Sequence, residues 1–313
     1  MDSHKNQFTI RTAMSKEKDK IQLSKLVNMY DPDCVFDEAK AIVRMAYKDI
    51  SLEPLCLVFR DVTDLFHGKY PGYRRCNTKY HDLRHTSDAF LVMARLIHGA
   101  ILGKERISGE NAILALIATL MHDVGYIQTE NDLSGTGAKY TKEHVDRSIK
   151  FMKKYYAKKG FSKEQFKMCS TLLLCTGLNT KLNEIPFPSL EAELLGKMVG
   201  TADLVGQMSD RTYLEKLPFL FHEFREANIR TYKNELDLII KTVDFYHTIK
   251  IRLAAEFGNV TRFLPAHFKA RYGISGNLYE ETIKSNMRHL KKFIKTSGMD
   301  YNKALRRTTA VFN

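Results

Sequence analysis

The segment from Asn111 to Tyr126, NAILALIATLMHDVGY, limits the fold of this chain more than any other. It is apolar nearly all round, as expected of a helix at the centre of a protein rather than at its surface. The segment nevertheless contains His122 and Asp123, which are costly to bury together unless their charge is compensated. A divalent cation would compensate both at once. The sequence therefore predicts a central helix that leads into a buried polar site.

Apolar residues recur at helical spacing along most of the chain, and alternating runs typical of strands are few. The sequence predicts an all-α multi-helix bundle. A short strand is expected at QFTIRT, loops at SGTGAKY and NEIPFPSL, a helix start at Ser189 and a turn at RYGISGN. The expected helices cover residues 36–47, 54–67, 82–102, 110–126, 141–159, 163–175, 189–208, 211–231, 234–257 and 278–297.

We expect a polar N-terminal segment at 1–30, a catalytic helical core at 31–210, and C-terminal helices at 211–313 that pack on that core as part of the same domain. No stretch reaches the roughly 18 apolar residues that a membrane helix needs, and the first 20 residues lack the apolar region of a secretory signal. The five cysteines have no CxxC spacing, which favours reduced thiols. These features predict a cytoplasmic protein without membrane contact.

The formal net charge of +13 favours anionic partners, such as nucleic acid, an acidic membrane surface or phosphorylated small molecules. It does not choose among them. The lysines are spread along the whole chain, so solvated helix faces account for most of this charge.

Two histidines stand four residues apart in NTKYHDLRH. His81 and His85 therefore project from the same side of a helix, or from the turn before a helix and its first turn. The segment that follows, residues 86–102, is apolar on more than one face. The two imidazoles can share one ligand inside a bundle.

A third carboxylate fits the same pattern. Asp203 follows Gly196 and Gly200 at helical spacing in an apolar segment, so it is placed to reach the same ion. With Asp203, the residues His85, His122 and Asp123 give two imidazoles and two carboxylates. That mixture suits Mn, Fe, Mg, Zn or Co, with coordination positions left for water and substrate.

The order of these residues, H-x-x-x-H, then His-Asp, then a distant Asp, resembles the HD-domain metal-dependent phosphohydrolase superfamily. YHDLRH is similar to the Y-H-N-x-x-H element of class I cyclic nucleotide phosphodiesterases, and MHDVGY is similar to their H-D-V-D-H. The resemblance covers roughly residues 75–210. It implies an all-α bundle in which His85, His122, Asp123 and Asp203 bind metal and His81 is the general acid.

Two positions depart from the phosphodiesterase pattern. Asp82 replaces the Asn, and Tyr126 stands where that family has a further His. No counterpart of the glutamine and aromatic pair that clamps the base is found.

The resemblance also implies a role for His144, which sits where many two-metal members of the superfamily place another ligand. Glu143 would then orient a bridging water. The alternative is a helix-start histidine, with Glu143 and Asp146 as first-turn acids. One or two divalent ions are therefore expected.

The implied activity is hydrolysis of a phosphoester, of a nucleotide or cyclic nucleotide, by metal-activated water in which Asp123 helps to hold that water and His81 protonates the leaving oxygen. The choice between phosphodiester and phosphomonoester stays open. Five cations near the expected ligands or on the glycine loop are candidate phosphate contacts: Lys79, Arg84, Lys139, Lys142 and Arg147.

Two other functions are kept as alternatives. One is a non-catalytic module that senses a nucleotide, and the other is a nucleic-acid-directed phosphodiesterase or binder, favoured by the positive charge. The C-terminal third is rich in aromatics and could close one wall of the pocket or form a homodimer surface. Six other histidines, at 67, 98, 222, 247, 267 and 289, receive no functional role.

Overall fold

A computed structural model describes residues 21–178 and 180–296 of this protein. In this part of the chain eleven α-helices and several short 3₁₀ helices form the structure, and the β-pairing is limited to one isolated bridge between Tyr73 and Thr129. The predicted all-α bundle is confirmed. The helices are α2 (Pro32–Ala46), α3 (Glu53–Phe66), α4 (Leu83–Leu102), α5 (Gly109–Met121), α6 (His144–Lys159), α7 (Lys163–Leu173), α8 (Leu190–Ser209), α9 (Tyr213–Glu226), α10 (Glu235–Ala255), α11 (Leu264–Tyr272) and α12 (Leu278–Lys295).

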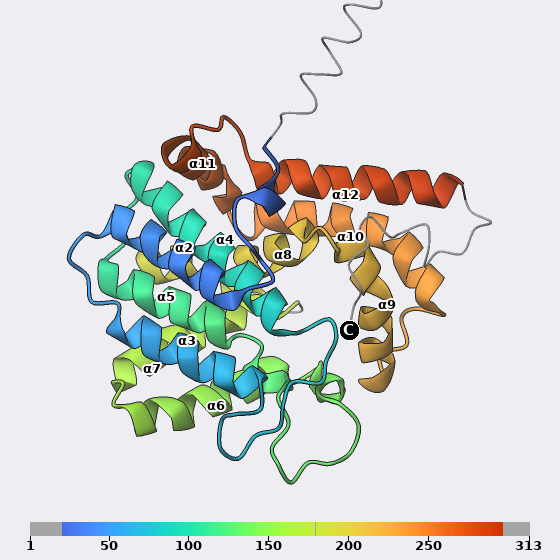
Figure 1. Ribbon diagram of the computed structural model, residues 1–313, viewed down its shortest axis with the longest axis horizontal. Helices are drawn as coiled ribbons and strands as arrows, with labels where there is room; N and C mark the ends of the chain where they lie inside the picture. Colours follow the sequence, from blue (N-terminus) through green and yellow to red (C-terminus); the bar gives the residue numbers. More distant parts are fainter. Residues whose placement is uncertain (1–20, 179, 297–313) are drawn as a thin grey trace, which may run out of the picture.

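Helix α4 lies at the centre of the molecule and packs against α2, α5, α8 and α11 (Figure 1). Its side chains are buried on all faces between Ala89 and Ala100. Helix α8 packs closely on it at Gly206, where an added Cβ would lie 2.9 Å from the backbone nitrogen of Ala89. The two helices that carry His85 and Asp203 are therefore held at short range by a glycine.

One cluster of buried hydrophobic side chains runs from Val35 in α2 to Phe293 in α12. Helices before and after residue 210 thus share a single core. Helix α9 lies on the opposite side of the molecule from α5 in Figure 1 and packs mainly on α10 and on the 3₁₀ helix Gly137–Tyr140. None of the helices in the described ranges is both long and apolar enough to cross a bilayer.

Several boundaries differ from the prediction. Helix α5 ends at Met121 rather than at 126, because Asp123 leaves the helical region (φ −108°, ψ 6°) and Val124–Tyr126 form a 3₁₀ turn. Helix α6 begins at His144 rather than at 141. The earlier end of α5 places His122 and Asp123 on a turn instead of on the helix itself.

Helix α11 was not predicted. It is short, it carries Pro265 in its first turn, and its buried face is limited to Leu264, His267 and Phe268. Such a segment has little of the apolar periodicity that reveals a helix in sequence. The expected helix start at Ser189 is confirmed, since its side chain accepts a hydrogen bond from the Ala192 amide. The strand expected at QFTIRT lies outside the described residues.

Candidate metal centre

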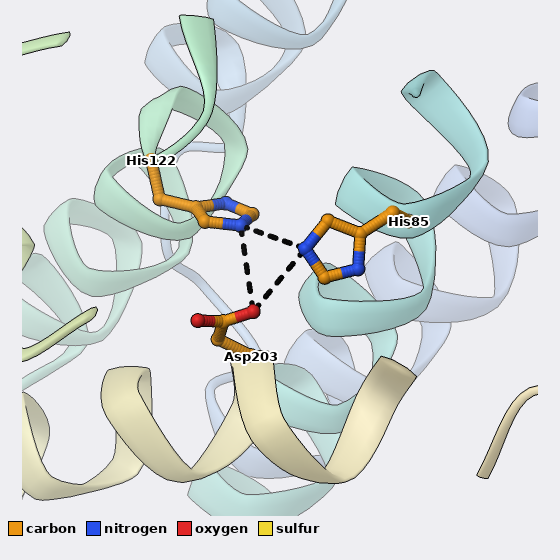
Figure 2. Close-up of side chains that lie close together, drawn as sticks. All are labelled: His85, His122 and Asp203. Carbon is orange, nitrogen blue, oxygen red and sulfur yellow. Dashed lines mark hydrogen bonds and ion pairs between the residues drawn. The ribbon is translucent and has the colours of Figure 1, made fainter. Parts of the chain in front are cut away.

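Three chain segments bring two imidazoles and two carboxylates together. His85 lies in the first turn of α4, His122 and Asp123 follow α5, and Asp203 lies in α8. The Nε2 atom of His85 is 3.3 Å from Nε2 of His122, 3.3 Å from Oδ2 of Asp123 and 3.2 Å from Oδ1 of Asp203. Figure 2 shows the two rings and the Asp203 carboxylate converging on one point.

The backbone around these ligands is fixed by short-range contacts. Asp82 caps α4, and its carboxylate accepts a hydrogen bond of 2.8 Å from the backbone amide of His85. The Ser148 hydroxyl accepts from the Gly125 amide and donates to the His122 carbonyl. A Cβ at Gly125 would lie 1.9 Å from the carbonyl oxygen of His144. Helix α6 can therefore cover the His-Asp turn only because residue 125 is glycine.

A backbone carbonyl fixes the tautomer of His122. Its Nδ1 donates to the carbonyl of Thr119 at 2.7 Å, which directs Nε2 at the carboxylates. This is the arrangement of a metal-binding histidine, whose second nitrogen is oriented by a hydrogen bond. The same device is present in His144, whose Nδ1 donates to the carbonyl of Thr141 at 2.8 Å.

The donor set suits a divalent ion. Donor atoms at about 2.1 Å from a metal lie about 3.0 Å apart when they are neighbours in an octahedron. The separations of 3.2 to 3.8 Å between the His85 and His122 nitrogens and the Asp203 oxygen are close to this value. Oδ2 of Asp123 is buried and forms no hydrogen bond within the described part of the chain. The group formed by His85, His122 and Asp203 could bind a metal ion, and Asp123 is placed to join it.

The electrostatics of the cluster favour a cation. Burial lowers the pKa of His85, but Asp123 and Asp203 outweigh that effect and raise it to about 10. The pKa of His122 is also raised, against burial, by Asp123. Burial raises the pKa of Asp123, yet the adjacent His122 holds it well below its usual range. Without metal, protons on the imidazoles thus balance the charge of the carboxylates. A divalent cation could replace these protons.

His81 lies beside this cluster but points to a different partner. Its Nδ1 is 2.6 Å from Oε2 of Glu223, a buried residue of α9. The other oxygen of Glu223 accepts hydrogen bonds from the backbone amides of Lys79 and Tyr80 at 2.9 and 2.7 Å. One carboxylate therefore fixes both the loop that carries His81 and the orientation of its ring.

Tyr126 separates two histidines. Its ring stacks on His81 with centroids 4.4 Å apart and on His144 with centroids 4.8 Å apart. Nε2 of His144 lies 3.8 Å from Oδ1 of Asp123. Because burial lowers the pKa of His144 and its Nδ1 is the donor, this Nε2 is a hydrogen-bond acceptor that faces a second acceptor.

The candidate phosphate contacts have partners of their own. Lys139 pairs with Asp132 at 2.5 Å, and Arg84 pairs with Asp210 at 2.7 Å. Asp132 also anchors the glycine loop through the Tyr140 hydroxyl. Both cations therefore carry structural interactions whatever else they bind.

The remaining three cations also have defined surroundings. Lys79 lies over the ring of Phe219, and Lys142 donates to a backbone carbonyl at 3.3 Å. Arg147 donates to the carbonyls of Gly125 and Ile127, and so braces the turn after Asp123 from its outer side. Whether any of the five contacts a phosphate stays a prediction.

Sequence reasoning missed Glu223 and Gln207. Gln207 accepts from the Tyr80 hydroxyl at 2.8 Å, and its amide nitrogen lies 3.5 Å from Asp203 Oδ1. Glu223 belongs to an aromatic-rich stretch, FLFHEF, whose composition is typical of a segment that packs against the core. A carboxylate 142 positions from its histidine leaves no spacing signal in the sequence.

Comparison with known proteins gives one likeness. A protein-family model described as Npun_R2479-like matches residues 129–261, which is less than half of the chain. The matched part contains His144, Asp203 and Glu223 but not His85, His122 or Asp123. No curated protein and no solved structure matches the chain.

Proposed function

We propose that this protein is a metal-dependent phosphohydrolase that cleaves a phosphoester bond of a nucleotide or cyclic nucleotide. The observation that carries the proposal is the convergence of two histidines on two carboxylates. The Nε2 atoms of His85 and His122 each lie 3.2 to 3.8 Å from an oxygen of Asp123 and an oxygen of Asp203, and a further histidine held by a carboxylate lies beside them. The order of these residues along the chain is the one that resembles the HD-domain superfamily.

The four side chains would hold one divalent ion, with Mn, Fe, Mg, Zn and Co as the candidates. Such an ion would lower the pKa of water and neutralise charge on the phosphoryl oxygens. The protein's own contribution is to keep the imidazole nitrogens directed inward, as the Thr119 carbonyl does for His122, and to limit access of bulk water. Access remains from the side of Asp203, His81 and His144, whose side chains are 15 to 19% exposed.

His81 is suited to give a proton to the leaving oxygen. Glu223 accepts from its Nδ1, which orients the ring and turns Nε2 away from α9. The ring stacks on Tyr126, so its plane is fixed as well. A positioned acid of this kind contributes roughly 10²- to 10⁴-fold to a rate.

His144 lies close enough to Asp123 for a water or a second cation to bind between them. Two acceptors, its Nε2 and Oδ1 of Asp123, face each other across 3.8 Å. A water that donates to both, or a second cation, would relieve that contact. This is why we propose one or two ions rather than a fixed number.

Metal analysis combined with a phosphodiester assay tests the proposal. Chelator-free wild type, Asp123→Ala and the surface control His247→Ala would be analysed for bound metal by mass spectrometry. The same samples would be assayed on bis-p-nitrophenyl phosphate and on nucleoside monophosphates with added Mn²⁺. His247 is exposed on α10, so its replacement changes the histidine count without touching the centre.

We expect about one to two ions and measurable hydrolysis in wild type and His247→Ala, and neither in Asp123→Ala. Metal without hydrolysis of any phosphoester would favour the nucleotide-sensing module instead. Oligonucleotide cleavage with a steep salt dependence would favour the nucleic-acid enzyme. Absence of metal after reconstitution would reject both the metal centre and the hydrolase.

A further inference from the structure

The second ring nitrogen of His85 differs from that of the other two histidines. Nε2 of His85 faces His122 and Asp203, and Figure 2 shows Nδ1 on the side of the ring turned away from both. Nδ1 of His122 and of His144 each donate to a backbone carbonyl. Among the residues that the structure describes, Nδ1 of His85 has no such partner. Histidines that bind metal almost always have their second nitrogen hydrogen-bonded to a carboxylate, a carbonyl or a water.

Asp88 has the complementary property. It lies three residues after His85 on α4, and residues at this spacing lie on the same face of a helix. Its carboxyl group makes no hydrogen bond or ion pair with any other described residue. The neighbouring cations are engaged elsewhere, since Arg84 binds Asp210 at 2.7 Å and Lys216 binds Asp82 at 3.3 Å.

One small cavity is lined by both residues. Its volume is about 10 Å³, and both His85 and Asp88 belong to its lining, together with Gln207 of α8. A volume of about 10 to 15 Å³ holds one water molecule, provided that the lining offers two or more polar partners. A donor at His85 Nδ1 and an acceptor at Asp88 meet that condition.

We propose that Asp88 is a positioning residue that accepts the Nδ1 hydrogen of His85 through one bound water and thereby keeps the Nε2 lone pair directed at the metal site. The role of Asp88 in metal binding rests on the proposed function, whereas the hydrogen bond itself does not. The link would give His85 what the Thr119 carbonyl gives His122. It would also explain why a carboxyl group without a direct partner lies in the space between α4 and α8.

Two substitutions separate the hydrogen bond from the charge. Asp88→Asn keeps an oxygen acceptor of the same size, whereas Asp88→Leu removes the acceptor and fills a similar volume. Burial and the nearby Asp210 raise the pKa of Asp88 to about 8, so asparagine also mimics the neutral acid. Asp244→Leu, on the exposed face of α10, is the control for a lost surface carboxylate.

The first readout is zinc affinity, measured by competition with a chelator. We expect Asp88→Leu to lose about 10- to 100-fold in affinity, with Asp88→Asn and Asp244→Leu close to wild type. Equal losses in the Asn and Leu variants would mean that charge alone matters and would overturn the proposal. Unchanged affinity in Asp88→Leu would overturn it as well.

The second readout is the His85 Nδ1–H resonance in the NMR spectrum, recorded with zinc and after chelator treatment. In wild type we expect a resonance protected from exchange, with a cross-peak to water, that broadens in Asp88→Leu but not in Asp88→Asn. This measurement on the wild type tests the hydrogen bond of His85 Nδ1 even if Asp88→Leu does not fold. If wild type binds no zinc, the proposed function fails, while the resonance of the chelator-treated protein still decides for or against Asp88.

Discussion

In the described part of the chain two pairs of histidines are buried, and the charges around the two pairs have opposite signs. His85 and His122 lie 3.3 Å apart between two carboxylates, whereas His98 and His267 lie 3.0 Å apart beside the buried guanidinium of Arg95. The pKa of His85 is raised to about 10, but burial and Arg95 lower that of His267 to about 2. Close imidazoles are therefore no sign of a metal site by themselves. The charge of the third partner decides whether a pair can hold a cation or stays neutral within the core.

Removing one histidine from each pair should give the largest difference between the two pairs. We expect His122→Ala to lose all bound metal after reconstitution, because it removes a ligand and its fixed Nε2. We expect His267→Ala to keep the wild-type metal content and to lose about 2 to 5 kcal/mol of stability, as a large-to-small change in the core does. Metal content and chemical denaturation would be measured on both.

Loss of metal from His267→Ala at a temperature where it stays folded would contradict the comparison. His98→Ala is the matched check, since it removes the other half of the same hydrogen bond. The two core variants should behave alike.

His81 has a third kind of environment, different from those of both buried pairs. His81 has a carboxylate partner, Glu223, but lies outside the metal ligands. On the proposed function we expect His81→Asn to lower kcat by about 10² to 10⁴ with metal content unchanged. Glu223→Gln should give a smaller loss, and the double variant should be no worse than His81→Asn.

Steady-state rates and metal analysis on the three variants test this coupling. Fully additive losses would mean that Glu223 acts on something other than His81. Loss of metal from His81→Asn would mean that His81 is a ligand rather than the acid.

The smallest expected effects are the pH slopes of stability, and they differ in sign between the two pairs. The folded pKa of His85 lies above its ordinary value of 6.5, so its contribution is complete below pH 6.5 and is lost as pH rises toward 10. The folded pKa of His267 lies below 6.5, so its contribution is lost as pH falls from 6.5. Each slope is at most about 1.4 kcal/mol per pH unit.

Urea denaturation of the metal-free protein at several pH values would measure these slopes. The alkaline slope should be flatter in His85→Gln and the acidic slope flatter in His267→Gln. If His85→Gln instead flattens the acidic slope, the carboxylates do not govern that pair.

Local pattern was enough to predict the bundle, and together with the order of the His and Asp residues along the chain it predicted that His85, His122 and Asp203 lie together. Helical spacing reports which face of a segment is buried, and His85, His122, Asp123 and Asp203 each stand at the edge or inside a strongly apolar segment. The break after Met121 was not predicted, because an apolar run does not show where its backbone leaves the helix. Helix α11 was missed because Pro265 and a narrow apolar face give it little periodicity.

The partners of the site residues could not be read from the sequence. Glu223 reaches His81 only because α9 folds back over the loop before α4, and the cavity between His85 and Asp88 exists only after α4 and α8 have packed. Likewise, Arg147 is near His144 in the chain, yet its side chain braces carbonyls behind the turn. Such pairings depend on tertiary contacts that have no fixed spacing.

Helix α9 ties two distant loops to one rigid body. Glu223 accepts from the amides of Lys79 and Tyr80, and Glu226, one turn further, accepts from the amide and hydroxyl of Thr136 in the glycine loop. Any motion that lifts α9 must release both loops in the same event. Amide hydrogen exchange at Lys79, Tyr80 and Thr136 should therefore report a single opening rate, so that entry to the site is governed by one motion rather than by two independent loops.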